Sequence, residues 1–145
     1  MKSRYAKILV AVSGQKADEE ALHLACGIAR ENKARVHVMY VIQVKRSLPL
    51  DAELEPEIQK AEEVLRRAEN IADELELEIE TDLLQAREIG PAVVGQAREQ
   101  DSDLIVMGID YRRRFGEFHV GENVSYILKN APCHVLLLRQ PVQER

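Results

Sequence analysis

The sequence has no excess of basic residues and no long apolar run, and each absence excludes a class of protein. The chain carries 20 Lys and Arg against 25 Asp and Glu, a formal net charge of −5. General nucleic-acid binding needs a basic surface, so we expect no nucleic-acid partner. The longest apolar runs, such as 8–12 and 135–138, are far too short to cross a bilayer, and the N-terminus has no signal-peptide apolar region. We therefore expect a cytoplasmic protein with no membrane insertion.

Cysteine and histidine are too few and too scattered to predict a metal or redox site. The two cysteines lie far apart and form no Cys-x-x-Cys motif. Cys26 lies among helical apolar residues and Cys133 opens the last expected strand, so we expect two buried free thiols. No Ser/His/Asp or Cys/His constellation predicts a catalytic centre, and we expect no enzyme, with slow ATP hydrolysis left open. Structural or surface roles, rather than metal binding, are expected for His23, His37, His119 and His134.

Apolar spacing predicts strands and helices in strict alternation. With 145 residues and 46% hydrophobic content, the chain is expected to form one domain, 1–145, around a single core. The alternation favours an α/β fold with one parallel sheet and helices on both faces. The polar segment 43–53 is expected to be the most mobile loop. We expect strands at 8–12, 35–41, 77–83, 103–107 and 134–138, and helices at 17–31, 56–75, 90–100 and 121–129.

The region from Asp103 to Arg139 has an order that is typical of phosphate-binding folds. A buried strand ends at Gly108, a long loop follows, and Gly121 stands at the start of a short helix. In an open sheet of this class, ligands bind beyond the carboxyl ends of the strands. That rule places 12–14, 40–41 and 108–121 around one crevice. Asp18 is expected only as a helix-start residue.

Several motifs together resemble the universal stress protein (UspA-like) family. They are the strand 8–12 with the turn after it, Ala21-x-x-x-Ala25, Gly90-Pro91-Ala92, Asp103 to Gly108, and Ala131-Pro132-Cys133-x-Val135. The resemblance covers essentially the whole chain. It implies an adenine-nucleotide α-hydrolase-like sheet of five parallel strands in the order 3-2-1-4-5. It also implies a homodimer, because members commonly pair their last strands antiparallel, here 134–139.

The resemblance further implies a nucleotide site, from which this chain departs at three positions. Nucleotide-binding members share Gly-x2-Gly-x9-Gly-Ser/Thr and an Asp after the first strand. Here Tyr111 stands at the second glycine, Glu122 at the Ser/Thr and Ser13 at the Asp. Two like charges ~4 Å apart repel by about 4 kcal/mol at an effective dielectric near 20, so Glu122 disfavours a phosphate. The implied nucleotide-binding residues are Ala11, Ser13, Val41, Met107, Gly108, Asp110, Tyr111, Gly121, Glu122 and Asn123.

The loop between the two glycines concentrates charge and aromatic rings. It holds Arg112, Arg113 and Arg114, and both phenylalanines of the chain, Phe115 and Phe118. The arginines either lie in solvent or supply charge to a phosphate, and the rings either pin the loop to its domain or form a patch for a partner. The loop also looks like that of UspA-like domains associated with membrane transporters, which suggests a transporter as partner.

These features predict a universal stress protein-like regulatory module. We expect it to act as a dimer through protein contacts, with a degenerate nucleotide-binding loop and no cofactor. The alternative is a stress sensor that binds ATP or AMP, with or without Mg, through an altered phosphate loop.

Overall fold

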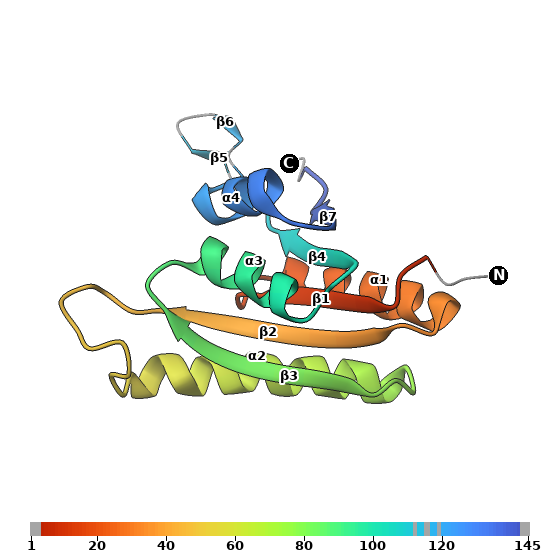
Figure 1. Ribbon diagram of the computed structural model, residues 1–145, viewed down its shortest axis with the longest axis horizontal. Coiled ribbons are helices and arrows are strands. Elements are labelled where there is room, and N and C mark those ends of the chain that lie inside the picture. Colours follow the sequence, from red (N-terminus) through yellow and green to blue (C-terminus); the bar gives the residue numbers. More distant parts are fainter. Residues whose placement is uncertain (1–3, 112, 115–116, 119, 143–145) are drawn as a thin grey trace.

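A computed structural model of the chain contains the predicted parallel sheet (Figure 1). It describes residues 4–111, 113–114, 117–118 and 120–142. The five-stranded sheet has the order β3-β2-β1-β4-β7, which confirms the predicted order 3-2-1-4-5. The strands are β1 (Lys7–Val12), β2 (Arg35–Gln43), β3 (Ile79–Ala86), β4 (Leu104–Ile109) and β7 (His134–Arg139), and the helices are α1 (Ala17–Asn32), α2 (Glu55–Glu74), α3 (Ile89–Glu99) and α4 (Glu122–Asn130).

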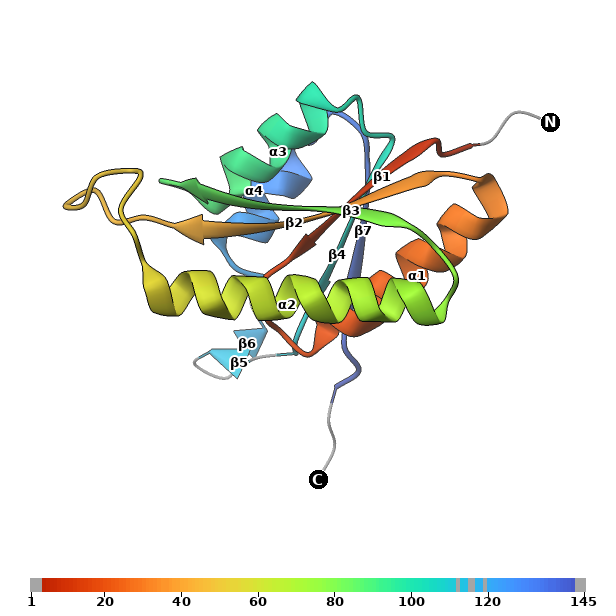
Figure 2. The same ribbon diagram turned by 90° about the horizontal axis from the view of Figure 1, so that it is seen from below.

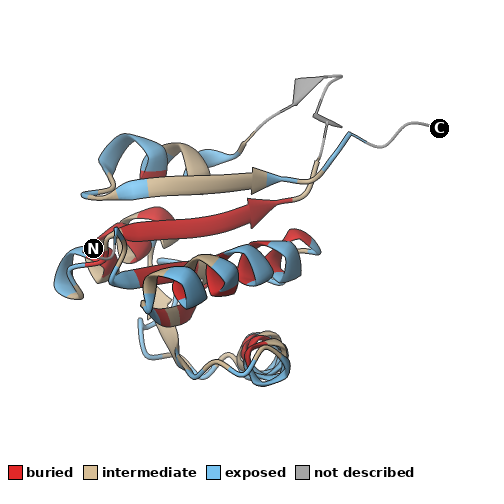
Figure 3. Cartoon of the chain, turned by 90° about the vertical axis from the view of Figure 1, so that its right-hand side faces the viewer, coloured by how far each residue is buried: buried red, intermediate tan, exposed pale blue. Residues whose placement is uncertain are grey.

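Helices α1 and α2 cover one face of the sheet, and α3 and α4 cover the other, as Figure 2 shows. The side chains of Ile8 and Val10 face α1 and α2, whereas that of Leu9 between them packs in the cluster with α3 and α4. β4 is buried along its whole length and β7 beside it only partly (Figure 3). A strand that is buried on both faces needs apolar residues at every position, which explains the continuous apolar runs.

The apolar residues of α2 form the face that packs on the sheet. Ala61, Leu65, Ala68 and Ala72 are buried, and Pro56 lies in the first turn, where its missing N–H costs no helical hydrogen bond. None of the helices in the described part of the chain has the length and apolar character that a membrane span requires.

The bounds of β2 and β3 differ from the predicted ones because pairing sets them. β2 continues to Gln43 and pairs with Ala86, and β3 begins at Ile79 opposite Val36. Leu77 was predicted to open this strand, but it lies just after the turn that follows α2, and its N–H donates to Ala72 O. Apolar alternation alone does not show where the partner strand ends.

A two-stranded hairpin lies within the segment that was predicted to be an uninterrupted loop. β5 (Arg113–Arg114) pairs antiparallel with β6 (Glu117–Phe118), and the hairpin lies outside the five-stranded sheet, between β4 and α4 in the chain (Figure 1). Strands of two residues are too short to produce a recognisable period in the sequence.

The thiols differ in burial. Cys26 is buried as predicted, but Cys133 is only partly buried, so its prediction was wrong: it stands at the margin of the sheet, before β7. Loss of solvent raises the pKa of both thiols above the ordinary value. Both therefore remain poorly nucleophilic at neutral pH.

Candidate functional site

A cavity lies at the carboxyl ends of β1 and β4, where the sheet order reverses. Its volume is about 670 Å³. All of the predicted nucleotide-binding residues except Tyr111 line it. Its apolar wall includes Ala11, Met39, Val41, Val93 and Met107, and its polar rim includes Ser13, Gln15, Asp110, Glu122 and Asn123.

Tyr40, Gly14 and Tyr111 lie away from this cavity, against expectation. Tyr40 belongs to the cluster on the opposite face of the sheet, because side chains alternate along β2 and only Val41 faces the cavity. Gly14 lines a different cavity between α1 and α2. The ring of Tyr111 lies over the guanidinium of Arg139, with 5.3 Å from Cζ to the ring centroid.

Gly108 is needed for packing rather than for a turn. It lies inside β4, opposite Leu138 of β7, so the prediction that the strand ends at Gly108 in a turn was wrong. A β-carbon at this position would lie 2.4 Å from the carbonyl oxygen of Ala17. Only glycine therefore lets the end of β4 approach the first residue of α1 so closely.

Gly121 precedes α4 in a backbone conformation that suits glycine. Its φ is 86° and it occupies the N-cap position, with Glu122 as the first helical residue. Asn123 Oδ1 accepts a hydrogen bond from the N–H of Gly90 at 3.3 Å, which ties α4 to the start of α3. The helix N-terminus, which would favour an anion, thus already carries the Glu122 carboxylate.

The turn between β1 and α1 is held by Asp18. Gly14 N–H donates to Asp18 Oδ2 at 2.7 Å, and Ser13 N–H lies 3.2 Å from the same oxygen. The side chain is buried, with 8% of the residue exposed. Burial raises the pKa of Asp18 to about 6, although the N–H groups of the turn oppose this and nearby Asp110 adds to it. Asp18 is therefore more than the predicted helix-start residue.

Gln15 connects the same turn to the end of β4. Its Oε1 accepts from the N–H of Asp110 at 3.0 Å, and its Nε2 donates to Ser13 Oγ at 2.7 Å. Asp110 Oδ1 accepts in turn from the N–H of Ala17 at 2.9 Å. The sequence prediction missed Gln15, because only the fold brings it next to a residue so distant in the chain.

The charged side chains that line the cavity in the described part of the chain are both acidic, Asp110 and Glu122. Of the loop residues predicted to contact a phosphate or a partner, Arg112 and Phe115 lie outside the described residues. The backbones of Arg113, Arg114 and Phe118 form the hairpin.

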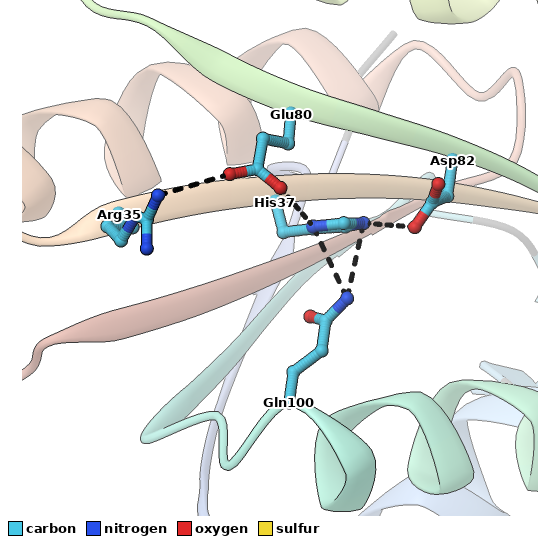
Figure 4. A network of polar contacts seen from close by, with 5 residues as sticks. All are labelled: Arg35, His37, Glu80, Asp82 and Gln100. Carbon is cyan, nitrogen blue, oxygen red and sulfur yellow. Dashed lines mark hydrogen bonds and ion pairs between the residues drawn. The ribbon is translucent and has the colours of Figure 1, made fainter.

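A second polar cluster lies near the start of β2 (Figure 4). His37 Nε2 is 2.5 Å from Asp82 Oδ2, and its Nδ1 is 3.6 Å from Glu80 Oε2. Gln100 Nε2 lies 3.3 Å from both ring nitrogens, and Arg35 pairs with Glu80 at 3.6 Å. Both ring nitrogens of His37 already have partners. These contacts link β2, β3 and the end of α3, which is the structural role predicted for His37.

The sequence comparisons and the structural comparisons point to the same protein family. The sequence model of the universal stress protein family matches residues 4–139. A universal stress protein of Methanocaldococcus jannaschii is 30% identical over 146 aligned residues, which cover 97% of this chain and 85% of the relative. The structure of a universal stress protein from Archaeoglobus fulgidus has a TM-score of 0.77 at 27% identity and covers 92% of this chain and 98% of that one. A structure of the universal stress protein from Archaeoglobus fulgidus in complex with dAMP has a TM-score of 0.73 at 27% identity, covering 92% and 97%.

Proposed function

Because this chain belongs to the universal stress protein family, we propose that it is a regulatory module whose cavity binds the adenosine part of a nucleotide but disfavours a polyphosphate. The observation that carries the proposal is the make-up of the cavity. It keeps an apolar wall and a hydrogen-bonding rim, while the charged residues that line it in the described part of the chain are acidic.

The size and lining of the cavity suit a nucleoside. A volume of about 670 Å³ lies in the range of small-molecule sites, which combine apolar walls with a few polar groups. Met39, Val41 and Met107 offer apolar surface to a base, and Ser13 and Gln15 offer polar atoms to a ribose or a ring edge. The dAMP complex of the Archaeoglobus fulgidus protein supports this ligand class.

The end of the cavity at α4 does not suit a triphosphate. A helix N-terminus attracts an anion, but Glu122 supplies one from the protein itself. Because Glu122 is exposed, a phosphate ~4 Å from its carboxylate is repelled by about 1 kcal/mol, the value in water, rather than by about 4 kcal/mol as at an effective dielectric near 20. The alternative, an ATP or AMP sensor with or without Mg, requires the arginines of 112–114 to neutralise this repulsion.

We further propose that the module acts as a homodimer through β7 and contacts protein partners through the hairpin. β7 is an edge strand of the five-stranded sheet, and its apolar residues 135–138 are only partly buried. Such an edge favours pairing with another strand. A membrane transporter is the partner class that the resemblance of the loop suggests.

Calorimetric titration with adenosine, AMP and Mg-ATP tests the ligand proposal. We expect adenosine and AMP to bind with similar affinity, and Mg-ATP to bind no tighter than the high-micromolar range. Glu122→Ser should strengthen Mg-ATP binding by on the order of tenfold and leave adenosine unchanged, because it removes one repulsive charge. Glu88→Ser, which removes an exposed carboxylate from the N-cap of α3 outside the cavity, is the matched control and should change neither.

Two results would contradict the proposal. A submicromolar dissociation constant for Mg-ATP in the unmodified protein would favour the sensor alternative. No binding of adenosine would mean that the cavity is not a nucleoside site.

The double change Arg113→Ala and Phe115→Ala separates the two roles of the loop. If the loop serves a protein partner, adenosine and AMP affinities should stay as in the unmodified protein. If the arginines neutralise a phosphate, AMP and Mg-ATP binding should be lost while adenosine binding remains.

A further inference from the structure

We propose that Asp18 is a positioning residue for the cavity, and that nucleoside binding weakens when this carboxylate takes up a proton. Asp18 holds the 13–15 turn, and this turn forms one wall of the cavity. The inference rests on the proposed function and adds the regulation of the same site.

The turn depends on Asp18 for its hydrogen bonds. The N–H groups of Ser13 and Gly14 both point to the Asp18 carboxylate, at 3.2 and 2.7 Å from Oδ2. Gly14 has a φ of 87°, a left-handed conformation that these bonds help to hold. A carboxylate accepts such bonds about twice as strongly as a neutral group.

The position of the turn affects ligand binding through Ser13 and Gln15. Both line the cavity, whereas Asp18 does not. Gln15 also bonds the backbone of Asp110, another residue of the rim, so a displaced turn changes two sides of the site. Asp18 thus acts through its neighbours and needs no contact with the ligand.

Protons can reach Asp18 from the opposite side of the turn. Asp18 lines a second cavity of about 380 Å³ between α1 and α2. Val12 and Gln15 line both cavities, but Asp18 lines only the second. Ligand in the first cavity therefore does not have to leave for Asp18 to titrate. This arrangement separates the titrating group from the binding surface.

The environment of Asp18 raises its pKa close to neutral pH. Burial raises its pKa to about 6, so the carboxylate is ionised at pH 7.5 and only about a tenth ionised at pH 5. Asp110, at the end of β4, adds to the rise through its negative charge. Other titratable or charged groups described near Asp18 are Lys60 and Arg67 of α2, Lys16 and Glu19 next to it in the chain, and Tyr40 of β2, which also faces Glu57.

Titrations with adenosine at pH 5, 6, 7 and 8 test the inference. Adenosine is preferred to AMP because a phosphate monoester itself titrates near pH ~6. In the unmodified protein we expect the affinity to fall about fivefold from pH 8 to pH 5, following the loss of two charge-assisted hydrogen bonds. Asp18→Asn should bind weakly and with the same affinity at every pH, because the amide keeps the shape but does not titrate.

Glu19→Gln is the matched control. It removes a carboxylate from the next residue of α1, but Glu19 is exposed and does not bond the turn, so its pH profile should match that of the unmodified protein. A flat profile in the unmodified protein, or a sloping one in Asp18→Asn, overturns the inference.

A measurement without ligand distinguishes failure of this inference from failure of the proposed function. The amide NMR signals of Ser13 and Gly14 should shift with pH, with a midpoint near 6, in the unmodified protein and not in Asp18→Asn. If these amides do not follow pH, Asp18 does not control the turn and the inference is wrong. If they do but adenosine binds at no pH, the proposed function is wrong and the positioning role falls with it.

Discussion

Ala17, the first residue of α1, has three residues of the site arranged around it. Its N–H donates a hydrogen bond to Asp110 Oδ1. Its carbonyl oxygen occupies the space that a β-carbon would need at position 108, and Asp18 follows it in the chain. Ala17 is fully buried, so these contacts are shielded from water. At this scale the site depends on backbone segments that lie close together, so few other side chains would fit at these positions.

The pH dependence of folding stability follows from the raised pKa of Asp18. The folded pKa is about 6 against an unfolded value near ~3.9, so the folded state binds more protons in between. The contribution of Asp18 to stability is therefore fully present below pH ~4 and is lost as pH rises through about 6. From pH 5 to pH 7 we expect a loss of about 1 kcal/mol from this group.

Urea denaturation of the unmodified protein and of Asp18→Asn at both pH values checks this prediction. The free energy of unfolding of the variant, relative to the unmodified protein, should rise by about 1 kcal/mol between pH 5 and pH 7. A constant difference would mean that the folded pKa of Asp18 is not raised.

At the scale of elements, the connection between β2 and α2 is held by two side chains at the end of β3, Gln85 in the strand and Arg87 just after it. Arg87 Nη1 donates to the carbonyl oxygens of Lys45 and Leu48 at 2.6 and 2.8 Å. Gln85 Nε2 donates to those of Leu50 and Ala52 at 2.8 and 3.0 Å. The sequence predicts a mobile segment at 43–53, and these bonds are what restrains it.

Arg87→Ala should therefore loosen the segment 45–53 with little effect on the core. We expect faster amide hydrogen exchange in peptides that cover 45–53, measured by mass spectrometry, and a loss of about 1 kcal/mol or less in global stability. Arg67→Ala removes an exposed arginine whose described partner is Glu63 on the same helix, and it should leave this exchange unchanged. Equal exchange in both variants would show that Arg87 does not hold the segment.

At the scale of the whole molecule, the two edges of the sheet differ. β3 lies at one edge and carries Glu80 and Asp82 in the cluster with His37, whereas β7 at the other edge presents Val135 to Leu138. Charged side chains protect an edge from pairing, and apolar ones do not. The proposed homodimer uses the edge without this protection.

Leu137→Pro should disrupt the proposed dimer, because proline cannot donate an N–H and distorts the strand. Light scattering is expected to show a dimer for the unmodified protein at micromolar concentration, and monomers or aggregates for the variant. Val142→Pro, beyond the end of β7 at an exposed position, is the control and should remain dimeric. A monomeric unmodified protein would contradict the prediction whatever the variant does.

The sequence by itself determined the layers of this protein, and only the tertiary structure decided the roles of its site residues. The alternation of strands and helices could be predicted because burial on one or both faces leaves a period in the apolar residues. The strand order was implied by the resemblance to the family, whose motifs are local in sequence. The bounds of β3, the pairing of 113–114 with 117–118 and the place of Tyr111 could not be predicted, since pairing partners and ring contacts lie elsewhere in the chain. Gly108 was recognised as special but for the wrong reason, and Asp18 and Gln15 were not recognised as residues that shape the site. The close approach at Gly108, the burial of the Asp18 carboxylate and the hydrogen bond from Asp110 to Gln15, 95 residues away, arise only when β4 and α1 pack together.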